Sequence, residues 1–117
     1  MPMNYGNIVS KHAQNGIAKV GPGTWARLVS SGTSPLPKRQ WIEIQVRGGM
    51  ALALAYTNRN ADGTFTSPAH SAQSSKIIPA NSIKGEPLGE TVMLWGRGVK
   101  KAGNTDGGVK VVVTEYA

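Results

Sequence analysis

The feature that most constrains this chain is a run over residues 39–47 in which apolar and polar side chains alternate strictly. One face of the run carries Ile42, Ile44 and Val46, and the other carries Trp41, Glu43, Gln45 and Arg47. Successive side chains of a β-strand point to opposite faces, so this period of two predicts a strand with one buried face. Such a strand needs a second layer of structure to cover its apolar side.

Similar short runs, separated by turn residues, recur along the chain. The predicted strands cover residues 17–20, 24–30, 39–47, 50–56, 76–84, 90–96 and 109–116. The 15 glycines and 7 prolines among 117 residues are typical of a turn-rich β protein, and no segment has a helical pattern. We therefore predict an all-β fold, a single antiparallel β-sandwich or jelly-roll-like domain over residues 17–117 with an extended N-terminal arm over residues 1–16.

Three features of the connections lead to further predictions. Gly48 and Gly49 separate two strands and indicate a β-hairpin. The long polar stretch over residues 57–75 is expected to cross from one sheet to the other. Pro79 has no N–H for a ladder, which places its segment at a sheet edge or a bulge.

The strand predicted over residues 50–56 is apolar on both faces. One face carries larger side chains, and the other is a flat surface formed by Ala51, Ala53 and Ala55. Both faces need cover, from a second layer of the same chain or from a neighbouring subunit. Trp41 poses a similar choice, because it lies opposite the apolar face of its own strand. It is either covered by its own chain or is an anchor in an interface.

The composition excludes several classes of catalytic site. The chain has no cysteine, so disulfides, cysteine-ligated metals and thiol catalysis are absent. Neither His12 nor His70 has a second ligand at metal-binding spacing, and the acidic residues are scattered. We therefore predict a protein that is not an enzyme and binds no metal or cofactor. An enzyme with a pocket in the 57–75 loop is an alternative that rests on the length of that loop alone.

No membrane partner is expected, because no apolar stretch reaches the ~18–20 residues that span a bilayer. Residues 1–11 also lack the apolar segment of a signal peptide, which predicts synthesis in the cytoplasm.

The formal net charge of +7 suits an acidic partner. Binding of single-stranded nucleic acid is one hypothesis, because Trp41 shares a strand face with Arg47, and Tyr116 shares one with Lys110. However, the basic residues are spread evenly along the chain, which argues against a dedicated nucleic-acid reader. The other hypothesis is a positive surface that binds an acidic protein.

Beyond these patterns, the order of segments resembles a known group of proteins. These segments are TWARLVS, RQWIEIQVR, ALALAY, IIPANSI, ETVMLWGRG and VKVVVTEYA. Over roughly residues 17–117 they are similar to small β-sandwich structural proteins of tailed-bacteriophage virions, of which capsid decoration, or cement, proteins are a prominent group.

The resemblance implies a protein that forms a homo-oligomer, with a trimer favoured, and stabilises a capsid by binding the major capsid protein or another virion subunit. It would be made in the host cytoplasm and reside on the capsid surface. A head–tail or tail component is the alternative. The expected contact residues lie in the arm, on the exposed strand face and in two basic pairs: Tyr5, Ile8, Val9, Lys38, Arg39, Trp41, Arg47, Lys100 and Lys101.

Overall fold

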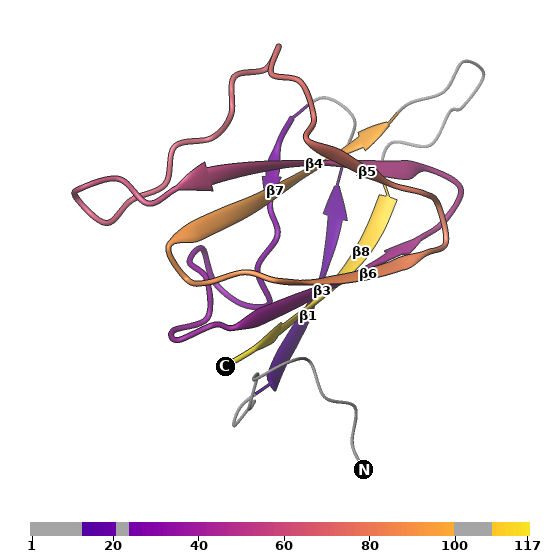
Figure 1. Ribbon diagram of the computed structural model, residues 1–117. Helices are drawn as coiled ribbons and strands as arrows, with labels where there is room; N and C mark the ends of the chain where they lie inside the picture. Colours follow the sequence, from indigo (N-terminus) through magenta and orange to yellow (C-terminus); the bar gives the residue numbers. More distant parts are fainter. Residues whose placement is uncertain (1–12, 21–23, 100–108) are drawn as a thin grey trace.

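The computed structural model describes residues 13–20, 24–99 and 109–117, which form strands, turns and loops (Figure 1). Within these ranges, no helix is long and apolar enough to cross a membrane. The strands are β1 (Ala13–Val20), β2 (Ala26–Arg27), β3 (Trp41–Arg47), β4 (Ala51–Asn58), β5 (Lys76–Ile78), β6 (Ile83–Pro87), β7 (Val92–Val99) and β8 (Val109–Tyr116).

These strands form two antiparallel sheets, which confirms the predicted all-β sandwich. Sheet I has the order β1-β8-β3-β6, and sheet II has the order β2-β7-β4-β5. In Figure 1, β4, β5 and β7 of sheet II lie above the strands of sheet I. The shortest strands, β2, β5 and β6, lie at sheet edges, and Pro79 falls between two of them as its missing N–H predicts.

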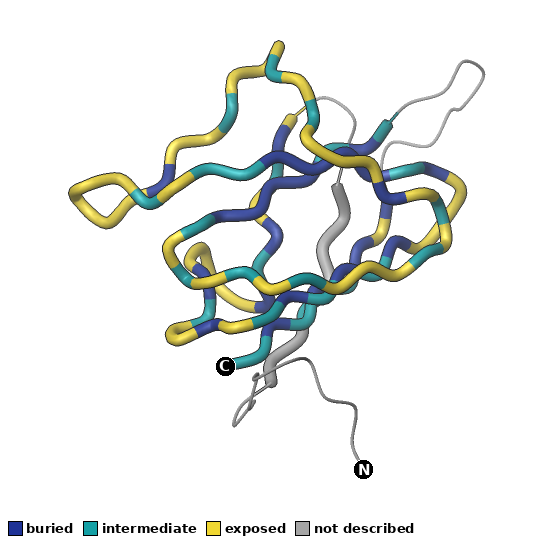
Figure 2. The backbone as a smooth tube through the Cα atoms, viewed as in Figure 1, coloured by how far each residue is buried: buried dark blue, intermediate teal, exposed yellow. Residues whose placement is uncertain are grey.

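The main core lies between the two sheets and is made by the alternation seen in the sequence. Figure 2 shows buried residues concentrated along the strands and exposed residues in the loops. The buried members of this core are Leu28, Ile42, Ile44, Val46, Met50, Leu52, Leu54, Ile78, Leu94, Val109, Val111 and Val113. The predicted buried face of β3 is therefore confirmed.

Two predicted connections are wrong. β3 and β4 do not form a hairpin, because β3 belongs to sheet I and β4 to sheet II. The Gly48–Gly49 link, in which Gly48 has a φ of +111°, carries the chain between the sheets. In contrast, β4 and β5 pair within sheet II, so the long loop between them does not cross. The different sheets of β3 and β4 have a physical reason. β4 is apolar on both faces and therefore fits sheet II, which has an apolar cluster on each face, whereas β3 has one polar face.

A second apolar cluster covers the outer face of sheet II. It comprises Trp25, Ala53, Ala55, Phe65, Met93 and Trp95. Trp25 precedes β2, and Phe65 comes from the loop between β4 and β5, so this chain itself covers the alanine face of β4. The fold therefore needs no neighbouring subunit at this surface.

The predicted arm ends earlier than expected. β1 begins at Ala13, and residues 13–16 pair with residues 113–116 of β8 as part of sheet I. Backbone pairing with a long neighbouring strand explains this extension, because it does not require an apolar side-chain pattern. The predicted contact residues Tyr5, Ile8 and Val9 lie outside the described residues, as do Lys100 and Lys101.

Candidate binding face

The outer face of sheet I is the candidate functional surface, and we refer to its described residues as the open face. They are Trp41, Glu43, Gln45 and Arg47 of β3, Lys110, Val112, Thr114 and Tyr116 of β8, and Ile83, Gly85 and Pro87 of β6. None of these residues is buried. On the outer face of sheet II, by contrast, Ala53, Ala55, Met93 and Trp95 are buried.

Strand register divides the open face into two chemically different ends. Trp41 is paired with Tyr116 on β8, and Arg47 is paired with Lys110. The aromatic and basic ends lie roughly 20 Å apart, because a strand rises about 3.4 Å per residue. Between them, Ile83 is 60% exposed. Aromatic, apolar and basic side chains thus share one rigid surface.

Trp41 lies across the boundary between β3 and β6. A Cβ atom placed on Gly85 would be 2.8 Å from Trp41 Nε1 and 2.9 Å from its Cζ2, so the indole ring lies over this glycine. A larger residue at position 85 would displace the ring. The half-buried Trp41 is therefore packed against a strand of its own chain.

The structure separates the predicted basic pair Lys38 and Arg39. Lys38 is exposed and has a φ of 61°, whereas Arg39 is only 3% exposed. The prediction that Arg39 is a surface contact is wrong, because its guanidinium group forms an ion pair inside the sandwich. Of the other predicted contacts within the described ranges, Trp41 is half-buried and Arg47 is exposed.

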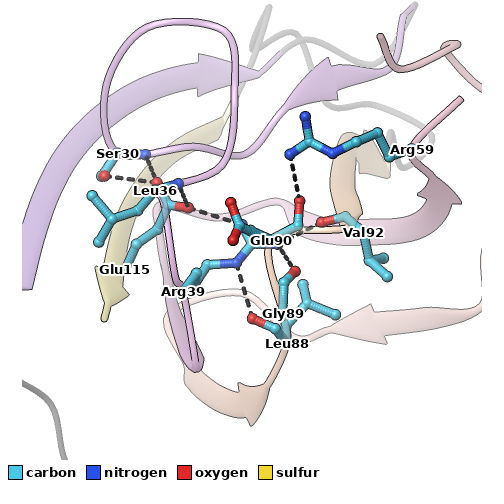
Figure 3. Close-up of polar contacts among 9 residues, drawn as sticks. All are labelled: Ser30, Leu36, Arg39, Arg59, Leu88, Gly89, Glu90, Val92 and Glu115. Atoms are coloured by element: carbon cyan, nitrogen blue, oxygen red, sulfur yellow. Dashed lines mark hydrogen bonds and ion pairs between the residues drawn. The ribbon is translucent and has the colours of Figure 1, made fainter. Parts of the chain in front are cut away.

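The partner of Arg39 is Glu115, which is 1% exposed (Figure 3). Arg39 Nη1 lies 2.8 Å from Glu115 Oε2. The same carboxylate accepts hydrogen bonds from the backbone N–H and hydroxyl of Ser30, both at 2.7 Å, and from Leu36 N at 2.9 Å. A buried carboxylate is tolerated when its oxygens are paired in this way.

Arg39 also donates to the first residue of β7 and to the segment before it. Its Nε donates to Leu88 O at 3.0 Å, and its Nη2 donates to Gly89 O at 2.8 Å and to Val92 O (Figure 3). Glu115 precedes Tyr116, whose carbonyl accepts a hydrogen bond from Gln40 N. The buried ion pair therefore fixes β3, β8 and two loops behind the aromatic end of the open face.

The ion pair predicts a loss of stability in acid. Burial alone would raise the pKa of Glu115, but hydrogen bonds from Ser30, Leu36 and Arg39 outweigh it and hold the pKa below its ordinary value of 4.5. Because the folded pKa is the lower one, the stabilisation is complete above about pH 4.5 and is lost as the pH falls through the folded pKa. Urea unfolding at pH 7, 4.5 and 3 should show this decline.

The Glu115→Gln variant is the control for that measurement. The pKa of the exposed Asp62 is also lowered, by hydrogen bonds from Thr64, and it contributes to the acid dependence of both proteins. The difference between the two pH profiles isolates Glu115. Identical slopes below pH 4.5 would contradict the assigned role of its carboxylate.

On the outer face of sheet II, two arginines pack against aromatic rings of the second apolar cluster. The guanidinium carbon of Arg97 lies 4.2 Å from the ring centroid of Trp25, and that of Arg59 lies 4.8 Å from the ring of Phe65. Arg97 also donates to His70 O at 2.6 Å and to Ala72 O at 3.3 Å. These contacts hold the long loop over the sheet, and the two arginines lie over the rings of Trp25 and Phe65, where a nucleic-acid base would have to stack.

Replacing Arg97 with alanine is expected to lower the free energy of unfolding by about 1–2 kcal/mol, because a cation–π contact and two hydrogen bonds are lost. Amide exchange should accelerate most in the loop over residues 66–75. Arg27→Ala is the matched control, since Arg27 is exposed and lies 5.3 Å from the ring of Trp95. Equal destabilisation by both substitutions would contradict the role given to Arg97.

A smaller cluster of three polar side chains connects β4, β5 and β6 at one side of the sandwich. Tyr56 donates its hydroxyl to Glu86 Oε1 at 2.6 Å, and Lys76 Nζ lies 2.9 Å from Glu86 Oε2. Burial, reinforced by the Glu86 carboxylate, raises the pKa of Tyr56 to about 12. These groups satisfy one another, and their arrangement points to structural closure rather than to proton transfer.

Some of these contacts had a signal in the sequence. In β8, the inward series of Val109, Val111 and Val113 continues to position 115, so its alternation already places Glu115 inside. No local pattern identifies Arg39 as the partner. Among the described residues, no group of three or more His, Asp or Glu side chains is arranged to hold a metal ion. Comparison of the sequence with models of known protein families and with curated proteins finds no match.

Proposed function

We propose that this protein is a non-enzymatic structural subunit that binds other protein subunits through its open face, as a component of a bacteriophage virion of the capsid decoration type. The open face is the observation that carries the binding role. The virion role follows from the resemblance of the sequence segments. A head–tail or tail component would use the same face in the same way.

The side chains of the open face suit a protein interface. Tryptophan, tyrosine and arginine are the residues most enriched in binding hot spots, and Trp41, Tyr116 and Arg47 lie on one sheet. Strand pairing holds their backbones before binding, which reduces the entropy lost on association. In the described ranges, the large exposed hydrophobic residues are Ile83, on the open face, and Ile77, at the edge of sheet II.

Decoration would stabilise a capsid by mass action. A subunit that binds the assembled shell but not its dissociated components stabilises the shell by RT ln(1 + [L]/Kd). The net charge of +7 would speed encounter with an acidic capsid surface. In this proposal the protein resides on the capsid surface, as a homo-oligomer in contact with the major capsid protein or another virion subunit.

Binding of single-stranded nucleic acid is the second candidate. It is favoured by one observation, that the aromatic pair Trp41 and Tyr116 and the basic pair Arg47 and Lys110 share the open face. Such binding would weaken steeply with salt, with a log–log slope of about −0.7 per phosphate contact. Quenching of tryptophan fluorescence by a dT oligonucleotide at low and high salt measures it directly.

The virion role is tested in particles produced by cells that carry the gene for this chain. Mass spectrometry of purified particles should find the protein in many copies per particle. Particles made with a Trp41→Ala/Arg47→Ala chain should retain less of it and release their genome at lower temperature. Lys38→Ala/Lys84→Ala, which removes two exposed charges outside the open face, is the control. Absence of the wild-type protein from the particles would refute the virion role.

A further inference from the structure

We infer that the open face binds the open face of a second copy of this chain, about a two-fold axis that lies between the two faces and runs perpendicular to their strands. This inference rests on the proposed function, in which the open face contacts another protein subunit, and it names a second copy of the chain, rather than the capsid, as the subunit that this face binds. It predicts a two-fold contact in place of the trimer that the resemblance implies.

The register of the open face makes it complementary to itself. A two-fold axis in this orientation keeps β3 over β3 and β8 over β8 but reverses their directions. With the axis at residue 44, Trp41 faces Arg47 of the second copy, and Glu43 faces Gln45. Along β8 the same operation, centred on residue 113, places Tyr116 over Lys110. One axis satisfies both strands because residue 44 is paired with residue 113.

The resulting contacts are chemically favourable. A cation within about 6 Å of an aromatic ring is attracted to its face, most strongly for tryptophan. Within its own fold the chain already uses this pairing, with Arg97 4.2 Å from the Trp25 ring and Lys76 5.6 Å from the Tyr56 ring. At the centre of the contact, the Gln45 amide is positioned to donate to the Glu43 carboxylate of the other copy.

Charge selects this orientation over the alternative. A two-fold axis parallel to the strands would keep the basic ends together and place Arg47 against Lys110 of the second copy. Like charges brought face to face repel, and no acidic residue of the open face lies at that end. The perpendicular axis instead moves each basic end onto an aromatic end, where its charge is attracted.

The size of the face predicts a weak dimer. Three strands about 4.8 Å apart and up to seven residues long present a flat area on the order of 350 Å². Two such faces bury roughly 700 Å², less than the ~1,200 Å² of a standard stable interface. Each copy also carries a net charge of +7, so salt should strengthen the contact by screening this repulsion. Nucleic-acid binding has the opposite salt dependence.

Sedimentation velocity of the full chain, up to about 1 mM and at two salt concentrations, tests the dimer. We expect a reversible monomer–dimer equilibrium that salt does not weaken. In this dimer the aromatic end of each copy meets the basic end of the other, which gives two sets of cation–π contacts. The variants Trp41→Ala/Tyr116→Ala and Arg47→Ala/Lys110→Ala each remove both sets. Each should weaken the dimer by about 100-fold, taking about tenfold per set. Lys38→Ala/Lys84→Ala, which loses the same charge outside the open face, should dimerise at least as tightly as the wild type, because it reduces the repulsion between the copies and leaves their contacts in place.

Mixing the two open-face variants tests the axis itself. In the mixed dimer, the aromatic end of one chain meets the basic end of the other with all four side chains intact. One set of contacts is restored, so the mixture should dimerise about tenfold more tightly than either variant alone. The Arg47 and Lys110 side chains are exposed, so their replacement leaves the fold intact even if the loss of Trp41 disturbs it.

Several outcomes would overturn this inference. A wild-type trimer, or no gain on mixing the two variants, would refute the two-fold geometry. A wild-type monomer at 1 mM would refute the second copy as partner. The proposed function would still stand in that case if open-face substitutions reduced retention on particles, and it would fail as well if they did not. A monomer whose fluorescence is quenched by oligonucleotide only at low salt would favour nucleic acid.

Discussion

Replacing Glu115 with glutamine is expected to lower the free energy of unfolding by about 3–5 kcal/mol. The substitution keeps the size of the side chain but removes its charge, so the buried Arg39 loses its ion-pair partner. Burial already lowers the pKa of Arg39, and the Glu115 carboxylate offsets part of that effect. The glutamine amide also brings N–H donors to a position where Ser30, Leu36 and Arg39 all donate. Urea unfolding at pH 7 measures the loss.

Two further variants make this prediction specific. Glu43→Gln neutralises a half-buried carboxylate on the open face of the same sheet, and we expect it to change stability by no more than about 0.5 kcal/mol. Replacing both members of the ion pair, as Arg39→Met/Glu115→Leu, removes the unpaired buried charge but leaves the Ser30 and Leu36 donors without their acceptor, so we expect it to recover only part of the loss. A Glu115→Gln protein that unfolds at the wild-type urea concentration would show that the carboxylate charge is dispensable.

The buried ion pair also matters for the open face. Trp41 and Tyr116 are neighbours across β3 and β8, while Glu115 faces inward directly behind them. Loosening the strand ends there would let the two aromatic side chains move independently, which raises the entropy cost of binding. Association of open faces should therefore weaken in Glu115→Gln before the protein unfolds.

The faces of the strands were predictable from the sequence, because side-chain alternation is a local property. The inward series of β3 and the outward positions of Trp41 and Arg47 followed from spacing alone. Sheet membership did not follow, because pairing depends on strands far apart in the chain. Thus a Gly-Gly link that favours a hairpin instead joins two sheets, and the loop expected to cross stays within one.

In the candidate site, too, the local pattern was predictable from the sequence and the long-range pairing was not. Trp41 with Arg47 and Tyr116 with Lys110 were each predictable as pairs on one strand, but only the register of β3 with β8 places them as aromatic and basic ends of one face. The expectation that Arg39 lies on the surface is wrong because the local sequence does not distinguish a surface arginine from a buried one. Its partner lies 76 positions away.

Replacing Gly16 with alanine is the other substitution with a large expected effect, about 3 kcal/mol or more. A Cβ atom on Gly16 would lie 2.2 Å from Ser30 O and 3.0 Å from Ser30 C, a contact with backbone that no rotamer change relieves. Either β1 or the segment around Ser30 must therefore move. Moving Ser30 would break its two hydrogen bonds to Glu115 and with them part of the buried ion-pair network.

Gly49→Ala is the matched control for this effect. A Cβ atom on Gly49 meets nothing within 4 Å, so we expect a neutral or slightly stabilising change, since alanine reduces the freedom of the unfolded chain. Urea unfolding gives the two stabilities, and amide exchange of β8 reports whether β1 leaves the sheet. If Gly16→Ala matched Gly49→Ala in both measurements, the packing of Ser30 against β1 would not constrain the fold. If Gly16→Ala and Glu115→Gln are both destabilising but less than additive, the two sites act through Ser30 as one unit, because residues that share a partner are energetically coupled.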